Sequence, residues 1–186
     1  MSTITRYLTE DELLRMPDDG NRYELIEGEL RQMAPTGYEH GRSTGNLHGL
    51  IAYHVRLNKL GDVLAAETGF VVARNAEGRA TVIAPDIAFV SRGRIPPGTN
   101  TFKFLELAPD LIVETLSPTD KAADIEEKIA LWLKAGVKLA LVLDPTSRSV
   151  IMHRSNSEVT TLTVASLLDL GNVIPGFQCN VSDIFD

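Results

Sequence analysis

The sequence predicts an α/β (α+β) domain in which a mixed β-sheet is flanked by helices and extended by β-hairpins. Two observations lead to this prediction. An apolar segment at 109–116, an amphipathic segment at 121–135 and a second apolar segment at 139–144 follow one another, which is typical of a strand–helix–strand unit. On either side, shorter segments alternate apolar and polar residues around turn sequences, which predicts antiparallel hairpins.

Length and composition are those of one ordinary globular domain, and we expect it to span 1–186. Hydrophobic residues make up 44% of the 186 residues and charged residues 23%, which is enough to build a sizeable core. The single cysteine, Cys179, excludes an intrachain disulfide and a thiolate metal cluster. The sequence has no apolar run of about 18 residues and no signal-peptide core at its start. We therefore expect a cytoplasmic protein without a membrane partner.

The first third of the chain should form a short helix, a hairpin and a long helix. The sequence TEDE at 9–12 has the form of a capping box, which predicts a helix over 10–16. Alternation over 23–33 predicts a β-hairpin. Helical spacing over 39–60 predicts a long helix, which we expect Gly61 to end.

The later segments are mostly strands. Apolar stretches predict strands over 62–74 and 81–90, and 149–154 and 159–164 are expected to pair antiparallel. The segment 91–108, between the apolar segments 81–90 and 109–116, contains two prolines and two glycines. It is expected to be a long loop of the kind that often carries function. The tail of the chain is expected to be irregular.

Two carboxylates interrupt apolar strands, Asp86 in IAPDIAFV and Glu114 in LIVETL. An ionisable group in a buried strand is costly, so it usually has a partner or a function. Carboxylates on neighbouring strands can hold a hard cation through oxygen ligands. A cation held there would polarise a phosphate and lower the pKa of a bound water. For Asp86, local hydrogen bonding at a strand end is the alternative.

The helix that follows Glu114 places a lysine near these carboxylates. Its apolar arc is formed by Ile125, Ile129, Trp132 and Leu133. At about 100° per residue, Lys128 lies roughly 40° from Trp132, whereas Lys134 falls on the opposite side. Lys128 should therefore point towards the body of the protein and meet Glu114. The alternative is a lysine that pairs with Asp124 on its own helix.

Together these residues resemble the Uma-two family of restriction-endonuclease-like proteins, a branch of the PD-(D/E)XK nuclease superfamily. The matching stretches are RYELIEGEL, the EHG that opens the long helix, APDIAFV, PDLIVETLSP and DIEEKIALWLKAGV leading to VLDP, within about residues 6 to 185. The resemblance implies a restriction-endonuclease-like core in which Asp86 and Glu114 bind metal. The usual strand lysine is replaced by Leu116, and the resemblance maps the lysine onto Lys128.

The resemblance also draws attention to three further residues. Glu24 and Glu27 match hairpin acids of the family, and either could complete the metal site or fix Lys128, although both could also be exposed hairpin residues. His40 matches the histidine at the start of the long helix and could shuttle a proton near neutral pH, unless it only caps or packs. The chain departs from the family at 139–141, where aromatic residues are usual, which should change packing rather than chemistry.

We therefore expect a Mg²⁺- or Mn²⁺-dependent endonuclease that hydrolyses phosphodiester bonds in DNA. Asp86 and Glu114 would bind the metal and Lys128 would assist the attacking water, with Glu27 and His40 in supporting roles. The net charge of −7, from 18 basic and 25 acidic residues, argues against tight non-specific DNA binding.

Two other functions remain open. The net charge favours a catalytically inactive nuclease-fold domain that binds or regulates. A hydrolase of small phosphoesters would use the same carboxylates without needing a basic groove. A homodimer is also expected, because exposed strand edges often pair across a two-fold axis.

Overall fold

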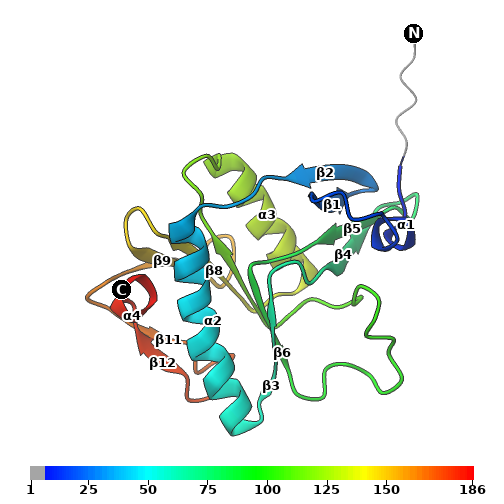
Figure 1. The fold of residues 1–186 in the computed structure, drawn as a ribbon. Coiled ribbons are helices and arrows are strands. Elements are labelled where there is room, and N and C mark those ends of the chain that lie inside the picture. Colours follow the sequence, from blue (N-terminus) through cyan, green and yellow to red (C-terminus); the bar gives the residue numbers. More distant parts are fainter. Residues whose placement is uncertain (1–6) are drawn as a thin grey trace.

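The structure, a computed structural model, describes residues 7–186 and contains two principal β-sheets (Figure 1). The larger sheet contains, in spatial order, β10 (Val159–Thr163), β9 (Ser149–His153), β8 (Leu139–Asp144), β7 (Leu111–Thr115), β6 (Ile87–Ser91) and β3 (Gly61–Ala65). The smaller sheet contains β2 (Glu29–Met33), β1 (Arg22–Ile26), β5 (Ala80–Ile83) and β4 (Phe70–Arg74). The first six residues, on which the absence of a signal peptide was partly judged, lie outside the described range.

Strand β7 occupies the interior of the larger sheet, between β8 and β6. It runs parallel to β8, with Glu114 opposite Val142, and antiparallel to β6, with Val113 opposite Ile87. All five of its residues are buried, as its apolar sequence predicted. Since the other pairs in this sheet are antiparallel, the prediction of a mixed sheet is confirmed.

Two helices cover opposite faces of the larger sheet. Leu47 and Ile51 of α2 (Tyr38–Asn58) pack in the same cluster as Val113 of β7. Trp132 of α3 (Ala122–Ala135) packs in a second cluster with Ile112 of β7. Because side chains alternate along a strand, Glu114 shares the α3 face with Ile112.

Two predicted strands are each divided between the sheets. The segment 62–74 forms β3 and β4, which belong to different sheets, and 81–90 forms β5 and β6 in the same way. The second division falls at Ala84, Pro85 and Asp86, and Pro85 has no N–H to donate to a ladder. Asp86 therefore lies where the chain crosses between sheets, rather than within a strand.

The helices largely follow the prediction. In α1 (Glu10–Leu14), the expected capping box between Thr9 and Glu12 is present. The long helix ends at Asn58, before the expected end at Gly61, and Lys59 caps it in a left-handed conformation with φ 54°. Gly61 is needed for another reason, since a Cβ there would lie 2.1 Å from the carbonyl oxygen of Val90.

The tail is more ordered than expected. Strands β11 (Leu167–Asp169) and β12 (Gln178–Asn180) form a two-stranded sheet, and α4 (Ser182–Phe185) follows it. The predicted loop between β6 and β7 contains no named strand or helix, and Lys103 within it forms a 2.8 Å ion pair with Asp11 of α1. Within residues 7–186, no helix is both long and apolar enough to span a membrane.

Candidate active site

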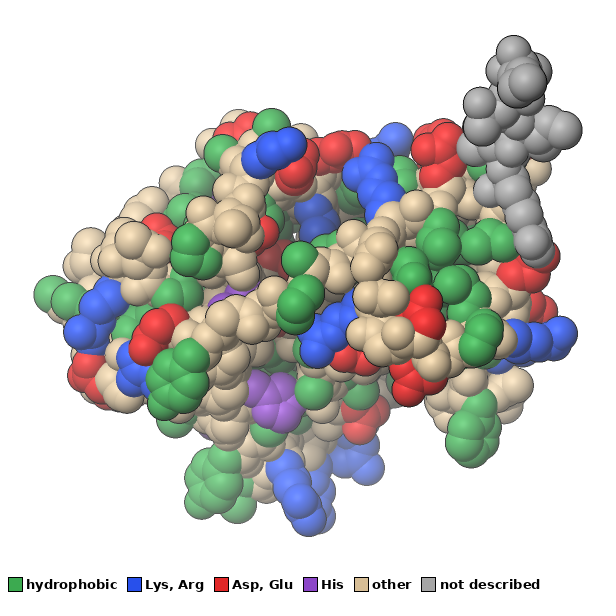
Figure 2. Space-filling model, turned by 45° about the horizontal axis from the view of Figure 1, so that its top comes forward, with side chains coloured by type: hydrophobic (Ala, Val, Ile, Leu, Met, Phe, Trp, Pro, Cys, Tyr) green, Lys and Arg blue, Asp and Glu red, His purple; other side chains and the backbone are tan. Residues whose placement is uncertain are grey.

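Glu24, His40, Asp86, Glu114 and Lys128 line a single cleft with a volume of about 390 Å³. They come from β1, α2, the β5–β6 connection, β7 and α3, so the site is assembled from both sheets and both long helices. Figure 2 shows a hollow on this face, with charged side chains visible inside it.

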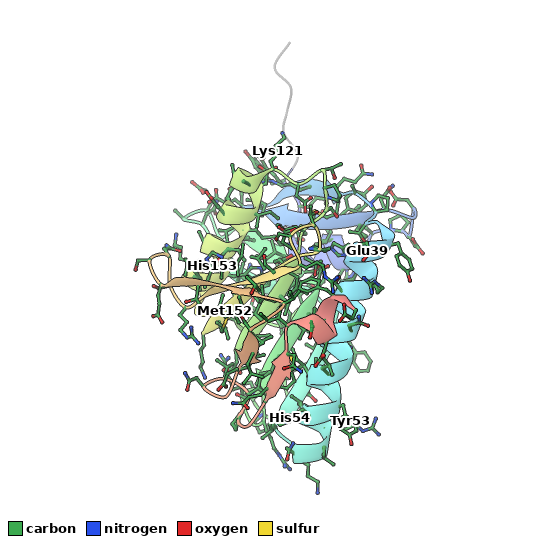
Figure 3. All side chains as sticks on the ribbon, turned by 90° about the vertical axis from the view of Figure 1, so that its left-hand side faces the viewer. Glu39, Tyr53, His54, Lys121, Met152 and His153 are labelled. Atoms are coloured by element: carbon green, nitrogen blue, oxygen red, sulfur yellow. The ribbon has the colours of Figure 1, made fainter. Side chains whose placement is uncertain are left out.

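The two long helices begin at the same end of the molecule. Glu39, next to His40 at the start of α2, lies near the end where Lys121 precedes α3 (Figure 3). Tyr53 and His54 lie at the opposite end of α2 (Figure 3). Hence only the first turns of α2 reach the cleft.

Lys128 points into the body of the protein, as the helical wheel predicted. Its Nζ lies 3.2 Å from Glu114 Oε1 and 3.1 Å from Glu24 Oε1, and it donates a 3.1 Å hydrogen bond to the carbonyl oxygen of Ala84. The side chain is only 16% exposed. The alternative pair with Asp124 does not form, because Asp124 is exposed and the described ion pairs of Lys128 go to the two glutamates.

Glu114 is a buried carboxylate, and the groups that donate to it contact only one of its two oxygens within residues 7–186. Trp132 Nε1 donates a 2.9 Å hydrogen bond to Glu114 Oε1, which also faces Lys128. Burial raises the pKa of Glu114 to about 7, although the positive charge of Lys128 opposes the rise. The carboxylates of Asp86 and Glu24 raise the pKa further.

Lys128 is the cation of this cluster. Burial lowers its pKa, but the carboxylates of Glu114 and Glu24 outweigh that effect and raise the pKa above the ordinary value for lysine. The ammonium group is therefore charged at neutral pH, and it can donate hydrogen bonds but cannot accept a proton.

Asp86 is held by the end of β7 and by α2. Its Oδ2 accepts a 2.8 Å hydrogen bond from the backbone N–H of Thr115 and lies 3.2 Å from His40 Nε2. The hydroxyls of Thr44 and Thr115 are 2.8 Å apart, which ties α2 to the same end of β7. His40 is 9% exposed and therefore contacts Asp86 from within the protein.

Glu24, and not Glu27, reaches the cleft. Glu24 Oε1 accepts a 2.9 Å hydrogen bond from the backbone N–H of Ala84 in addition to its pairing with Lys128. Glu27 is exposed at the hairpin turn with φ 52°, and its Oε2 lies 3.5 Å from Asn75 Nδ2. The structure does not bring Glu27 into the site, because Glu27 lies in the turn after β1, in a left-handed conformation outside the strand. Of the two hairpin glutamates, only Glu24 lines the cleft.

The two carboxylates on β7 and the β5–β6 connection suit a hard divalent cation. Within residues 7–186, Glu114 Oε2 and Asp86 Oδ1 accept no hydrogen bond, so each carboxylate keeps one oxygen for another ligand. The described residues contain no cluster of three or more His, Cys, Asp or Glu arranged to hold a metal. Mg²⁺ is commonly held by one or two carboxylates together with water and substrate phosphates, and these two residues fit that pattern.

Among the contacts of the site that were not predicted from the sequence, two involve the Lys128–Glu114 pair directly. Trp132 was identified only as part of the apolar arc of its helix, although a buried indole N–H usually finds an acceptor. The carbonyl oxygen of Ala84, which accepts from Lys128, is a backbone group with no sequence signal. The role of Trp132 as a donor to Glu114 could have been predicted, because Trp132 is four residues after Lys128 and therefore lies one turn further along the same helix.

The comparisons with known proteins agree with this fold. The family model Uma2, described as "Putative restriction endonuclease", matches residues 10–182 and supports a nuclease-like function. A solved structure, described as a putative nuclease belonging to DUF820 from Anabaena variabilis, superposes with a TM-score of 0.79. It is 21% identical in sequence, and the match covers 96% of this chain and 97% of that chain, which shows a shared fold. No curated protein matches the chain. Since the family model covers most of the sequence, this chain belongs to the Uma2 family.

Proposed function

We propose that this protein is a Mg²⁺- or Mn²⁺-dependent endonuclease that hydrolyses phosphodiester bonds in DNA. The observation that carries the proposal is the contact between Lys128 and Glu114, 3.2 Å apart, in a cleft that Asp86 also lines. A cation beside two carboxylates is suited to phosphate chemistry, because a phosphate needs positive charge and an attacking water needs orientation.

Asp86 and Glu114 would hold the metal through Oδ1 and Oε2, the oxygens that accept no hydrogen bond within residues 7–186. When bound, Mg²⁺ or Mn²⁺ would polarise the phosphate and lower the pKa of a bound water. His40 would keep Asp86 oriented by its contact with Oδ2, leaving Oδ1 directed to the ligand.

Lys128 would stabilise the developing negative charge on the phosphate through its own positive charge, or would donate to the attacking water after releasing one of its contacts with Glu114, Glu24 and Ala84. Its raised pKa makes it a poor proton acceptor, which argues against a role as general base. Glu24 and the carbonyl oxygen of Ala84 hold its ammonium group in place, which fixes the donor before substrate arrives.

The expected homodimer stays a prediction. A second copy would suit cleavage of both DNA strands. Sedimentation of the purified protein at several concentrations would test it directly.

The proposed function is tested by incubating supercoiled and linear DNA with the purified protein and Mg²⁺ or Mn²⁺. We expect cleavage by the native protein and by Asp124→Asn, a matched control whose carboxylate is exposed on α3 outside the cleft. Asp86→Asn and Glu114→Gln should abolish cleavage. Calorimetry should detect Mn²⁺ binding to the native protein that each of these two variants loses.

Other outcomes would select the alternatives. Intact DNA together with no Mn²⁺ binding would favour the nuclease-fold binding or regulatory domain, which the net charge of −7 already suits. Hydrolysis of a small phosphoester without cleavage of DNA would favour the small-phosphoester hydrolase.

A further inference from the structure

The cleft that contains the candidate active site also has an apolar wall. This wall is formed by Leu13, Leu14, Met16, Met33 and Phe104, and these residues line the same cleft as Glu114 and Lys128. They come from α1 and the residues after it, from the end of β2, and from the loop between β6 and β7. One cleft therefore combines a charged site with a wall of apolar side chains.

Two members of the wall are exposed to solvent. Leu14 is 41% exposed and Met33 is 38% exposed, although both are large apolar side chains. Met33 ends an edge strand whose five residues are all exposed. Leu13 and Phe104 pack against the core cluster that contains Leu25, whereas Leu14 and Met33 join no core cluster within residues 7–186. Apolar side chains that line a cleft in this way favour a ligand with an apolar face.

Phe104 gives the wall a fixed aromatic ring. A Cβ added to Gly69 would lie 2.7 Å from this ring, so the ring rests directly against the backbone of Gly69. Gly69 also lines the cleft. Flat rings and methionine side chains are the groups on which nucleic-acid bases stack or pack, whatever the sequence of the bases.

We propose that the cleft takes one nucleotide unit of single-stranded or locally unpaired DNA, with the base against the apolar wall and its phosphate directed to Asp86, Glu114 and Lys128. This inference rests on the proposed function for its choice of DNA as substrate. It adds that the site acts on a nucleotide outside the base stack, as enzymes do when their target cannot be reached inside a duplex.

Size and charge both favour a single unit over a duplex. A volume of about 390 Å³ lies near the lower end of the roughly 300–1,000 Å³ typical of small-molecule pockets. A duplex carries one negative charge per about 1.7 Å of its axis and needs many basic contacts. The net charge here is −7, and basic side chains on the cleft face are scattered among acidic ones (Figure 2). A single nucleotide unit would place far fewer negative charges against the protein than a duplex would.

Methionine methyl signals offer a direct test, since three of the four methionines lie within residues 7–186, in different surroundings. Met16 and Met33 line the cleft, whereas Met152 is 4% exposed in the core on β9. Protein labelled with ¹³C at the methionine methyl groups is titrated with thymidine 5′-monophosphate in the presence of Mg²⁺. We expect the Met16 and Met33 signals to shift with saturation while the Met152 signal stays in place.

Two variants of β2 separate the apolar wall from general surface effects. Met33→Ser should weaken the binding of thymidine 5′-monophosphate by about fivefold or more. Leu30→Ser is the matched control, because Leu30 is also 38% exposed on β2 but does not line the cleft, and its affinity should equal that of the native protein. Circular dichroism would establish that both variants keep the fold.

The pocket and the catalytic proposal fail in different ways. Signals of Met16 and Met33 that do not move, or equal weakening in both variants, would overturn the nucleotide pocket even if DNA is cleaved. Saturable shifts without any cleavage would uphold the pocket and defeat the catalytic proposal. If DNA is cleaved, a short single strand should be cut at least about tenfold faster than the same strand in a blunt duplex, and equal rates would count against the pocket.

Discussion

Trp132 Nε1 and Glu114 Oε1 are joined by a buried hydrogen bond of 2.9 Å, made to the oxygen that also faces Lys128. Trp132 and Lys128 are one turn apart on α3, so a single helix face supplies both donors. With Oε1 occupied in this way, Glu114 Oε2 is left for a ligand in the cleft. The indole therefore helps to determine which oxygen a metal would meet.

Replacing Trp132 with Phe should affect both stability and the titration of Glu114. Above about pH 7, where Glu114 is ionised, the loss of a hydrogen bond to this charged group should cost about 1–3 kcal/mol in the free energy of unfolding, measured with urea. The indole lowers the pKa of Glu114, so its removal should shift the pH midpoint of activity upwards. Phe70→Leu is the control, because Phe70 packs edge-on against Trp132 and makes no bond to Glu114. A midpoint that moves equally in both variants would contradict this role for the indole.

Lys128→Met should be strongly destabilising as well as inactive. Without the ammonium group, Glu24 and Glu114 remain together in a buried site, and breaking a buried pair in this way costs about 3–5 kcal/mol. Denaturant unfolding above pH 7 measures the loss, and Lys134→Met, an exposed lysine on the same helix, should change stability little.

A double variant distinguishes charge compensation from catalysis. Adding Glu24→Gln to Lys128→Met removes one of the two uncompensated carboxylates and should restore part of the lost stability. Activity should remain absent, because the donor to the attacking water is still missing. Recovery of activity in the double variant would show that Lys128 is needed only for the fold.

The sequence predicted those site residues that can be recognised from their own short segment of the chain. Asp86 and Glu114 stand out as charges within apolar segments, and Lys128 stands out on the inner edge of an amphipathic helix. The choice between Glu24 and Glu27 depends on which face of the hairpin meets the rest of the protein, and that is decided by packing against β5 and α3. No pattern within the hairpin itself contains this information.

The fold shows the same limit. The strand–helix–strand unit from β7 to β8 was predicted closely because each element carries a strong apolar pattern and a clear end, such as Gly136 with φ 104° after α3. The strands over 81–90 were wrongly joined because apolar residues continue on both sides of Pro85 while the chain passes from one sheet to the other. Tertiary pairing makes this division, and only the proline hints at it.

His40 should act as a positioning residue for Asp86. His40→Ala removes the contact 3.2 Å from Asp86 Oδ2, and loss of such a supporting contact typically lowers metal affinity or activity by about 10–100-fold. His40→Gln, which can still donate to Oδ2, should retain much of the Mn²⁺ affinity measured by calorimetry. His54→Gln is the control, because His54 Nε2 lies 2.9 Å from the carbonyl oxygen of Pro175 at the other end of α2. Equal Mn²⁺ affinity in His40→Ala and the native protein would exclude the positioning role.

The pH dependence of stability and of activity should have opposite signs because of Glu114. Its pKa is about 7 in the folded protein, against an ordinary value of 4.5, so the folded protein binds this proton more tightly than the unfolded chain does. The resulting stabilisation is complete below about pH 4.5 and is lost as the pH rises to about 7. Activity should instead rise over the upper part of this range, since metal binding requires the ionised carboxylate.

Urea unfolding and DNA cleavage across this pH range test both signs. Unfolding is measured with a chelator present, because a bound metal would lower the pKa of Glu114 and hide the effect. Glu114→Gln cannot titrate at this position, so the stability of the native protein relative to this variant should fall between about pH 4.5 and about 7. A relative stability that rises over the same range would mean that Lys128 and Trp132 outweigh burial and hold Glu114 ionised in the metal-free protein.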